Sequence, residues 1–284
     1  MNKVKTNTDT ASRKKTDNNK QQHEIYLTFG EHLELFRKMI FRIASVAIAF
    51  AVAIFCCKTI VWKWLMAPSE YDFCTYRWIE QFLRACGTDF AFEPFHVKMI
   101  ATELSSQFMT HLSTSLYLGM LATSPYIVYE LFKFISPALY DNERKYSVRI
   151  TCIVYGLFII GVLMSYFILF PISFRFLGTY SVSPMIESNI TLDSYITTFT
   201  SLTLIMGVVF QLPVIAFFLG KIGLISSAVM AKYKKHALVA IMIIAAVITP
   251  PDVMTLILVA LPLYLLYLVS ISIVKKTERK AAGE

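Results

Sequence analysis

Residues 150–170 read ITCIVYGLFIIGVLMSYFILF and contain no Asp, Glu, Lys or Arg. An α-helix rises about 1.5 Å per residue, so this stretch extends about 30 Å, the thickness of the hydrocarbon core of a bilayer. Four other apolar stretches are long enough to cross a bilayer: residues 39–62, 108–132, 195–219 and 253–274. The sequence therefore predicts a polytopic, all-α membrane protein.

A sixth apolar stretch, residues 237–248, is short for a span, because as a helix it reaches only about 18 Å. The sequence Thr249-Pro250-Pro251-Asp252 follows it and must turn the chain. A core helix or a re-entrant segment is one interpretation of such a length. We favour a short span in a locally thinned bilayer, because six spans agree with the distribution of charge.

The composition supports a membrane protein over a soluble one. Hydrophobic residues form 56% of the 284 residues and charged residues form 16%, whereas about a quarter of the residues in a soluble domain are charged. The net charge of +8 does not indicate nucleic-acid binding, since no stripe of Arg with interleaved aromatic residues lies outside the spans. We divide the chain into a disordered basic tail (residues 1–23), a six-span membrane domain (24–274) and a second tail (275–284).

Lys and Arg predict the orientation of the spans. The N-terminal segment up to Arg42, the C-terminal tail and the loops at 133–149 and 221–235 carry 21 of these residues, and the intervening loops carry six. By the positive-inside rule, both termini are cytosolic, and we expect the protein in a bacterial inner membrane. The outer interface is marked by an aromatic belt of Trp62, Trp64 and Trp78.

Few ionisable side chains lie within the predicted spans, and lipid makes each of them costly. Glu130, near Lys133, suits an interfacial role as well as a functional one, and His111 is expected to form a structural hydrogen bond. Gln211 has two interpretations of equal weight. It bonds the carbonyl freed by Pro213, or it contacts another helix or a partner's span.

Three prolines, Pro125, Pro213 and Pro262, lie inside predicted spans and are expected to bend their helices into curved walls. Enzyme signatures are absent from the sequence, and the five cysteines lack the spacing of metal ligands. We therefore predict no catalysis, no cofactor and no metal site.

Four segments, in order along the chain, carry the motifs of one family. They are His32-Leu33-Glu34-Leu35-Phe36-Arg37; Ser124-Pro125-Tyr126-Ile127-Val128-Tyr129 with Phe134-Ile135-Ser136-Pro137-Ala138-Leu139-Tyr140 and Glu143-Arg144; Phe210-Gln211-Leu212-Pro213-Val214; and Thr249-Pro250-Pro251-Asp252-Val253 with Leu261-Pro262-Leu263-Tyr264. With these motifs the chain resembles TatC, the core subunit of the twin-arginine translocase. The resemblance extends from residue 29 to residue 264 and implies six transmembrane helices in a curved, glove-like bundle with both termini cytosolic.

The resemblance also implies a function. A protein of this family is the receptor of the translocase: it binds Arg-Arg signal peptides on its cytosolic face and nucleates assembly with TatA-type subunits. The assembly then exports folded proteins using the proton-motive force. The implied partners are these signal peptides, TatA-type and TatB-type single-span subunits, other copies of the chain and membrane lipids, with no nucleic acid.

Three groups of residues follow from the resemblance. The signal-peptide site would contain Glu143, Glu34, Phe134, Arg37 and Arg144. Contact with a partner helix would involve Gln211 and Pro213. Structural motif residues would be Pro68, Pro125, Pro137, Tyr140 and Asp252.

Two positions depart from the family pattern. The family's first-loop glutamate falls on Leu35, and Glu34 stands one position earlier, which turns it by about 100° around a helix. The usual fourth-span glutamate is Gln211, and an amide cannot carry a proton.

Two rival functions remain. A small-solute transporter or channel needs a continuous polar path, which Gln211 and His111 alone do not supply. A passive assembly scaffold would bind partner spans and no signal peptide.

The outer loop, residues 58–103, is long, and residues 76–84 are predicted to form a short amphipathic helix. Cys74 and Cys86 flank this helix, and a disulfide and two free thiols both stay open as interpretations.

Overall fold

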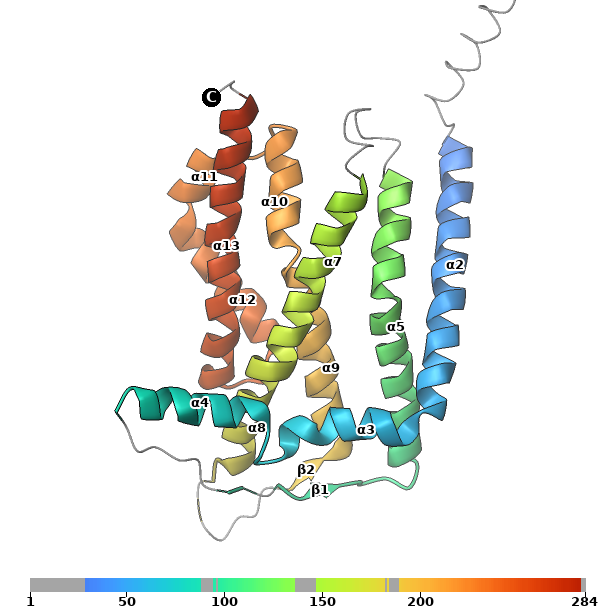
Figure 1. Ribbon diagram of the computed structural model, residues 1–284, viewed down its shortest axis with the longest axis vertical. Helices are drawn as coiled ribbons and strands as arrows, with labels where there is room; N and C mark the ends of the chain where they lie inside the picture. Colours follow the sequence, from blue (N-terminus) through green and yellow to red (C-terminus); the bar gives the residue numbers. More distant parts are fainter. Residues whose placement is uncertain are drawn as a thin grey trace, which may run out of the picture.

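The protein is a bundle of long helices with two shorter helices lying across one end (Figure 1). The computed structural model describes residues 29–87, 94–95, 97–135, 147–181, 183 and 189–281. The helices that run along the bundle axis are α2 (Phe29–Cys56), α5 (Ser106–Ile135), α7 (Ser147–Met164), α8 (Phe170–Thr179), α9 (Leu192–Val209), α10 (Leu212–Lys221), α12 (Lys234–Ile248) and α13 (Val253–Ala281). Four of the described helical segments are long and apolar enough to cross a membrane: Leu33–Cys56, Thr151–Thr179, Leu192–Lys221 and Val253–Arg279.

The two ends of the bundle differ, and each is named here. At the cap end, α3 (Lys58–Met66) and α4 (Cys74–Ala85) run across the bundle axis, joined by the short helix η1 (Ala67–Ser69) (Figure 1). At the tail end, α2 begins and α13 ends (Figure 1). Near the cap end, the strands β1 (Met99–Ile100) and β2 (Ile190–Thr191) pair in parallel, with Met99 opposite Ile190.

The first helix differs from the sequence prediction. The span predicted for residues 39–62 ends at Cys56, and the chain turns at Cys57 into α3. Lys58 and Thr59 begin α3, and the prediction ran past them because the apolar residues Ile60, Val61 and Trp62 follow directly.

Proline has two different effects in the described helices. Pro125 and Pro262 lie inside the continuous helices α5 and α13. Pro213 lies at the start of α10, directly after the break that separates it from α9. Pro171, which the sequence analysis did not single out, follows the π-helical turn η3 (Ser165–Leu169) that joins α7 to α8. A proline at this position removes a donor and crowds the preceding turn, which explains the wider turn.

Two close helix contacts hold the bundle together. A Cβ atom on Gly119 of α5 would lie 2.7 Å from the backbone of Ala51, so the absence of a side chain lets α2 and α5 approach. A Cβ atom on Gly161 of α7 would lie 2.5 Å from the Met206 carbonyl oxygen on α9. Small residues commonly permit such contacts in membrane helices.

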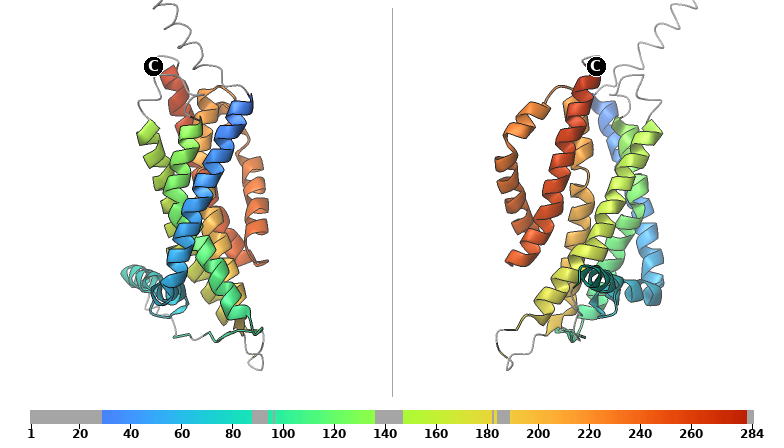
Figure 2. Two further views of the ribbon diagram at one scale, coloured as in Figure 1. Left: turned by 90° about the vertical axis from the view of Figure 1, so that its right-hand side faces the viewer. Right: turned by 60° about the vertical axis from the view of Figure 1, so that its left-hand side comes forward.

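The core surrounds α9, where Leu202 and Met206 are fully buried. Phe170 packs edge-on against Tyr195 and Phe199, with ring centroids 5.0 Å apart in both pairs. On one side of this core, α11 (Ser227–Lys232) and α12 lie against α13 (Figure 2). Glu278 of α13 accepts a hydrogen bond from the Ser227 backbone N–H at 2.9 Å, which ties α11 to α13.

Candidate functional site

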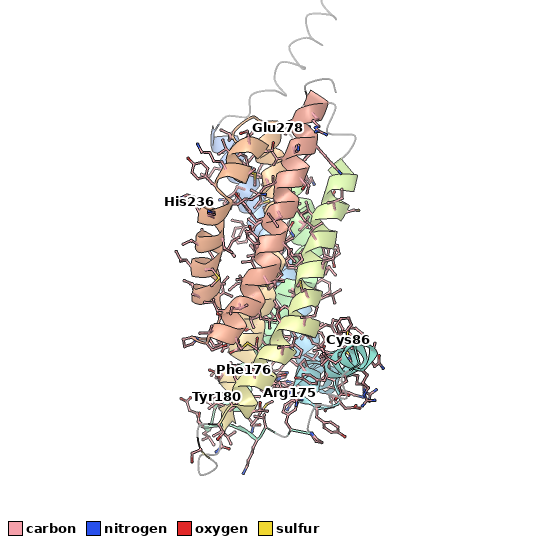
Figure 3. The ribbon with its side chains drawn as sticks, turned by 90° about the vertical axis from the view of Figure 1, so that its left-hand side faces the viewer. Cys86, Arg175, Phe176, Tyr180, His236 and Glu278 are labelled. Carbon is pink, nitrogen blue, oxygen red and sulfur yellow. The ribbon has the colours of Figure 1, made fainter. Side chains whose placement is uncertain are left out.

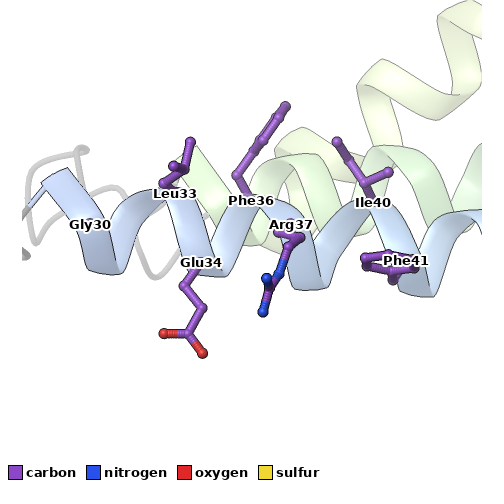
Figure 4. Close-up of a pocket in the computed structure, with 7 residues that line it drawn as sticks. All are labelled: Gly30, Leu33, Glu34, Phe36, Arg37, Ile40 and Phe41. Atoms are coloured by element: carbon purple, nitrogen blue, oxygen red, sulfur yellow. The ribbon is translucent and has the colours of Figure 1, made fainter.

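The first turns of α2 carry an open depression at the tail end (Figure 4). Its volume is about 550 Å³, and the lining residues are Gly30, Leu33, Glu34, Phe36, Arg37, Ile40 and Phe41. Leu33, Phe36 and Ile40 point to one side of the helix, and Glu34 and Arg37 point to the other (Figure 4). The helix thus presents an apolar side and a charged side next to each other.

Glu34 forms an ion pair with Lys38, one helical turn on, at 2.8 Å. Both side chains are about half exposed, and exposed pairs of this kind contribute little stability. The Glu34 carboxylate therefore exchanges Lys38 for another cation at low cost.

Phe36 joins α2 to the end of α5. Its ring lies 5.7 Å from the ring of Phe134, the predicted signal-site residue on α5. Glu34 and Phe36 point to opposite sides of α2 (Figure 4). Glu143 and Arg144 lie outside the described residues, as do Pro137 and Tyr140.

An ion pair that the sequence analysis did not find lies between α2 and α5, with a buried carboxylate and a half-exposed guanidinium. Glu130 is 5% exposed, and its Oε1 atom lies 3.3 Å from Nη1 of Arg42. The Tyr126 hydroxyl donates a hydrogen bond to the same oxygen at 3.0 Å. Lys133 is the cation nearest to Glu130 in the sequence of the same helix. Arg42 comes from another helix, and no local pattern reveals that contact.

His111 on α5 stacks on Phe55 of α2, with ring centroids 4.3 Å apart. Its Nε2 atom is buried and has no hydrogen-bond partner among the described residues. The expectation of a hydrogen-bonded histidine is therefore not met at this nitrogen, and aromatic packing holds the ring instead.

Gln211 lies in the break between α9 and α10. Its Nε2 atom donates to the Val154 carbonyl on α7 at 3.2 Å and to the Gly207 carbonyl at 3.4 Å. Its Oε1 atom is buried and has no partner in the described part of the chain. The structure thus gives Gln211 an interhelical bond within the bundle, and Pro213 follows in the first turn of α10.

Tyrosine hydroxyls hold the end of α3 onto the bundle. Helices leave their last carbonyls without an internal partner. The Tyr166 hydroxyl donates to the Trp64 carbonyl and the Tyr195 hydroxyl donates to the Leu65 carbonyl, both at 2.8 Å. Side chains of the spans therefore satisfy the carbonyls at the end of α3.

The π-helical turn and the first turn of α8 each receive a hydrogen bond from a side chain of α4. Pro171 has no N–H to give to the Phe167 carbonyl, and the Thr75 hydroxyl donates to it instead. The Tyr76 hydroxyl donates to the Pro171 carbonyl at 2.9 Å and approaches the carbonyl of the motif residue Pro68 at 3.3 Å. Burial raises the pKa of Tyr76, so its hydroxyl stays protonated and keeps donating.

Asp252, another motif residue, ends the turn between α12 and α13. Its Oδ1 atom accepts a hydrogen bond from the Thr255 backbone N–H at 2.6 Å. A carboxylate at this position caps the helix, and its negative charge interacts favourably with the positive end of the helix dipole. The structure gives Asp252 a local structural role.

Cys74 and Cys86 are free thiols. Cys74 is the first residue of α4, and Cys86 directly follows its last residue. Residues twelve apart in a helix are separated by about 18 Å, and a disulfide needs Cα atoms within about 7 Å. The disulfide interpretation is therefore wrong, while the predicted amphipathic helix is confirmed as α4. Among the described residues, no group of three His, Cys, Asp or Glu side chains is placed to hold a metal ion.

The chain resembles known proteins over most of its length. Residues 31–262 match the family model described as Sec-independent protein translocase protein (TatC). A Sec-independent protein translocase protein TatC of Blattabacterium sp. subsp. Periplaneta americana is 35% identical over 251 residues, which cover 87% of this chain and 94% of that protein. A protein of the same name from Helicobacter pylori is 41% identical over 189 residues, covering 66% of this chain and 70% of that protein.

A solved structure shares the fold. The crystal structure described as Twin Arginine Translocase Receptor-TatC superimposes with a TM-score of 0.68 at 27% sequence identity. The match covers 87% of this chain and 100% of the solved chain.

Proposed function

Because this chain belongs to the TatC family of Sec-independent protein translocase proteins, we propose that it is the receptor subunit that binds twin-arginine signal peptides. As a translocase component it is a transporter-type membrane protein and not an enzyme. Polytopic helical architecture is common to the chain and its solved relative.

We also propose that the chain crosses a bacterial inner membrane six times. In this proposal the tail end of the bundle lies in the cytosol. Two observations support it. The described chain begins and ends at the same end of the bundle (Figure 1). Most Lys and Arg residues belong to the tails and to the loops at 133–149 and 221–235, and the positive-inside rule puts such segments in the cytosol.

The pairing of Phe36 with Phe134 carries the assignment of the site. It holds the charged first turns of α2 beside the end of α5. Residues 136–146 follow α5 directly and carry Glu143 and Arg144. In this proposal Glu143 and Glu34 pair with the two guanidinium groups of the signal, since planar bidentate pairing suits Arg and a carboxylate.

The remaining residues have supporting roles in the proposal. Arg37 and Arg144 bind and orient the two carboxylates, and Phe134 packs against the signal next to its arginines. The apolar side of the depression, formed by Leu33, Phe36 and Ile40, accepts the apolar part of the signal.

Assembly with other subunits completes the proposed function. We propose TatA-type and TatB-type single-span proteins and further copies of this chain as partners in proton-motive-force-driven export of folded proteins. Gln211 and Pro213 lie at the break between α9 and α10. We assign both to the contact with a partner's helix.

Signal-peptide binding tests the receptor function. A charge-assisted hydrogen bond contributes about 1.5–3 kcal/mol, so Glu143→Lys should lower the affinity for an Arg-Arg peptide about tenfold or more. Glu143→Gln should give an intermediate affinity, because it keeps an acceptor without the charge. A Lys-Lys peptide should bind the unmodified protein more weakly, because ammonium groups cannot pair bidentately.

Glu70→Lys is the matched control. Glu70 is exposed at the cap end, so this variant makes the same change of charge far from the proposed site. Equal binding of Arg-Arg and Lys-Lys peptides by the unmodified protein would contradict the proposed receptor function. If the unmodified protein prefers the Arg-Arg peptide and the Glu143 variants bind that peptide equally well, the receptor function is retained and Glu143 is not part of the site.

A further inference from the structure

Helix α4 extends sideways from the bundle at the level where η3 meets α8 (Figure 1). Cys86, next to the far end of α4, lies toward the cap end, as Arg175 does, while Glu278 lies at the tail end (Figure 3). The segment formed by α7, η3 and α8 is called the third span here, in the order of the six-span proposal. Two hydrogen bonds to this span, from Thr75 and Tyr76, fix the height of α4 along the bundle.

The two long faces of α4 differ in chemistry. Successive residues turn by about 100° around a helix, so Trp78 and Phe82 share one face with Thr75 and Ile79. Trp78 is 58% exposed and Phe82 is 69% exposed. The opposite face carries the polar residues Arg77, Glu80, Gln81 and Arg84.

Contacts with the third span show which way the apolar face points. That span runs from the tail end to the cap end, so Phe167 lies nearer the middle of the bundle than Pro171. Thr75 bonds the Phe167 carbonyl, and the ring of Trp78 lies 6.2 Å from the ring of Phe167. Tyr76 bonds the Pro171 carbonyl on the other side. The face with Trp78 and Phe82 is therefore directed toward the middle of the bundle, where the membrane lies.

The height of α4 matches a bilayer surface. The candidate span begins at Thr151, and Phe167 is sixteen residues further on, a distance of about 24 Å along a helix. A hydrocarbon core of about 30 Å that starts near Thr151 thus ends close to Pro171. The same span exposes Ile160, Leu163 and Ile168, so apolar surface reaches the height of α4.

We infer that α4 is an interfacial helix whose Trp78 and Phe82 side chains insert among the phospholipids of the leaflet at the cap end. An amphipathic helix that lies flat, with aromatic residues toward the acyl chains and charges toward water, binds this boundary. Tryptophan favours the level of the headgroups because its ring is apolar and its N–H is polar. The lipid contact does not depend on the proposed receptor function.

Tryptophan fluorescence in lipid nanodiscs tests the inference. The chain has three tryptophans, so the difference between the unmodified protein and Trp78→Phe reports Trp78 alone. Bromine atoms on lipid chains near the headgroups should lower this contribution about twofold or more, while bromine atoms near the chain ends and aqueous iodide should act more weakly.

Gln81→Trp in the Trp78→Phe background is the matched control. It places an indole on the polar face of the same helix, where iodide should quench it and brominated lipid should not. Strong quenching of Trp78 by iodide alone would put α4 in water. Protection of Trp78 from both quenchers would mean that a protein partner or a second copy covers it, and stronger quenching by deep bromine atoms would place it inside the acyl layer. Each of these three results overturns the inference.

Discussion

Two ion pairs on α2 differ in burial and should differ in energy. Arg42 pairs with Glu130, which is almost fully buried, and Lys38 pairs with the exposed Glu34. Arg42→Met leaves the buried carboxylate without its cation, and we expect a loss of about 2 kcal/mol in the free energy of unfolding. Lys38→Met should change it by less than about 0.5 kcal/mol. Chemical unfolding in detergent measures both.

A double-mutant cycle separates the ion pair from packing. Arg42→Met combined with Glu130→Met removes both charges, so the double variant should recover part of the stability that Arg42→Met loses. Additive losses would show that the two charges do not interact, contrary to the 3.3 Å contact.

At the scale of elements, the contact between α7 and α9 depends on a glycine. Gly161→Ala would place a Cβ atom 2.5 Å from the Met206 carbonyl oxygen, so the two helices must separate. We expect a loss of about 1–3 kcal/mol in the free energy of unfolding, as for overpacked cores. Gly156→Ala on the same helix has nothing within 4 Å and should leave stability unchanged or higher. Equal thermal stability of the two variants would contradict the close approach.

The attachment of α4 to the third span gives a second prediction about elements. Thr75→Val removes the hydroxyl that donates to the Phe167 carbonyl. This carbonyl has no helical partner, because Pro171 lacks the backbone N–H that would otherwise bond it. An unpaired buried carbonyl costs about 1–3 kcal/mol, so amide hydrogen exchange in α4 should accelerate. Thr197→Val, at an exposed position on α9, should leave exchange in α4 unchanged.

At the scale of the whole molecule, the arrangement of the helices predicts the topology. The turn at 249–252 lies toward the cap end, and the start of α12 lies toward the tail end (Figure 2). Reporter fusions within 172–196 and at 249–252 should therefore report the outside, and fusions within 221–235 should report the cytosol. A cytosolic signal at 249–252 would mean that α12 does not cross, and the six-span proposal would fail.

The sequence alone determined the features that depend on local composition. Long apolar runs predicted the four candidate spans that the structure contains, while the run at 108–132 forms α5, which is not among them. The pattern of residues 76–84 predicted the amphipathic helix α4. The motif segments predicted the family. These features follow from hydropathy and periodicity within one segment, so no partner segment is needed to recognise them.

The tertiary structure decided which segments meet. It ended α2 at Cys56, paired Glu130 with Arg42 and gave Gln211 the Val154 carbonyl of α7. It also separated Cys74 from Cys86 along α4, which excludes a bridge. Arg42 and Glu130 are 88 positions apart in the chain, and only the packing of α2 on α5 brings them together. Composition sets the free energy of placing each helix in lipid, whereas contacts such as these depend on which helix faces pack together.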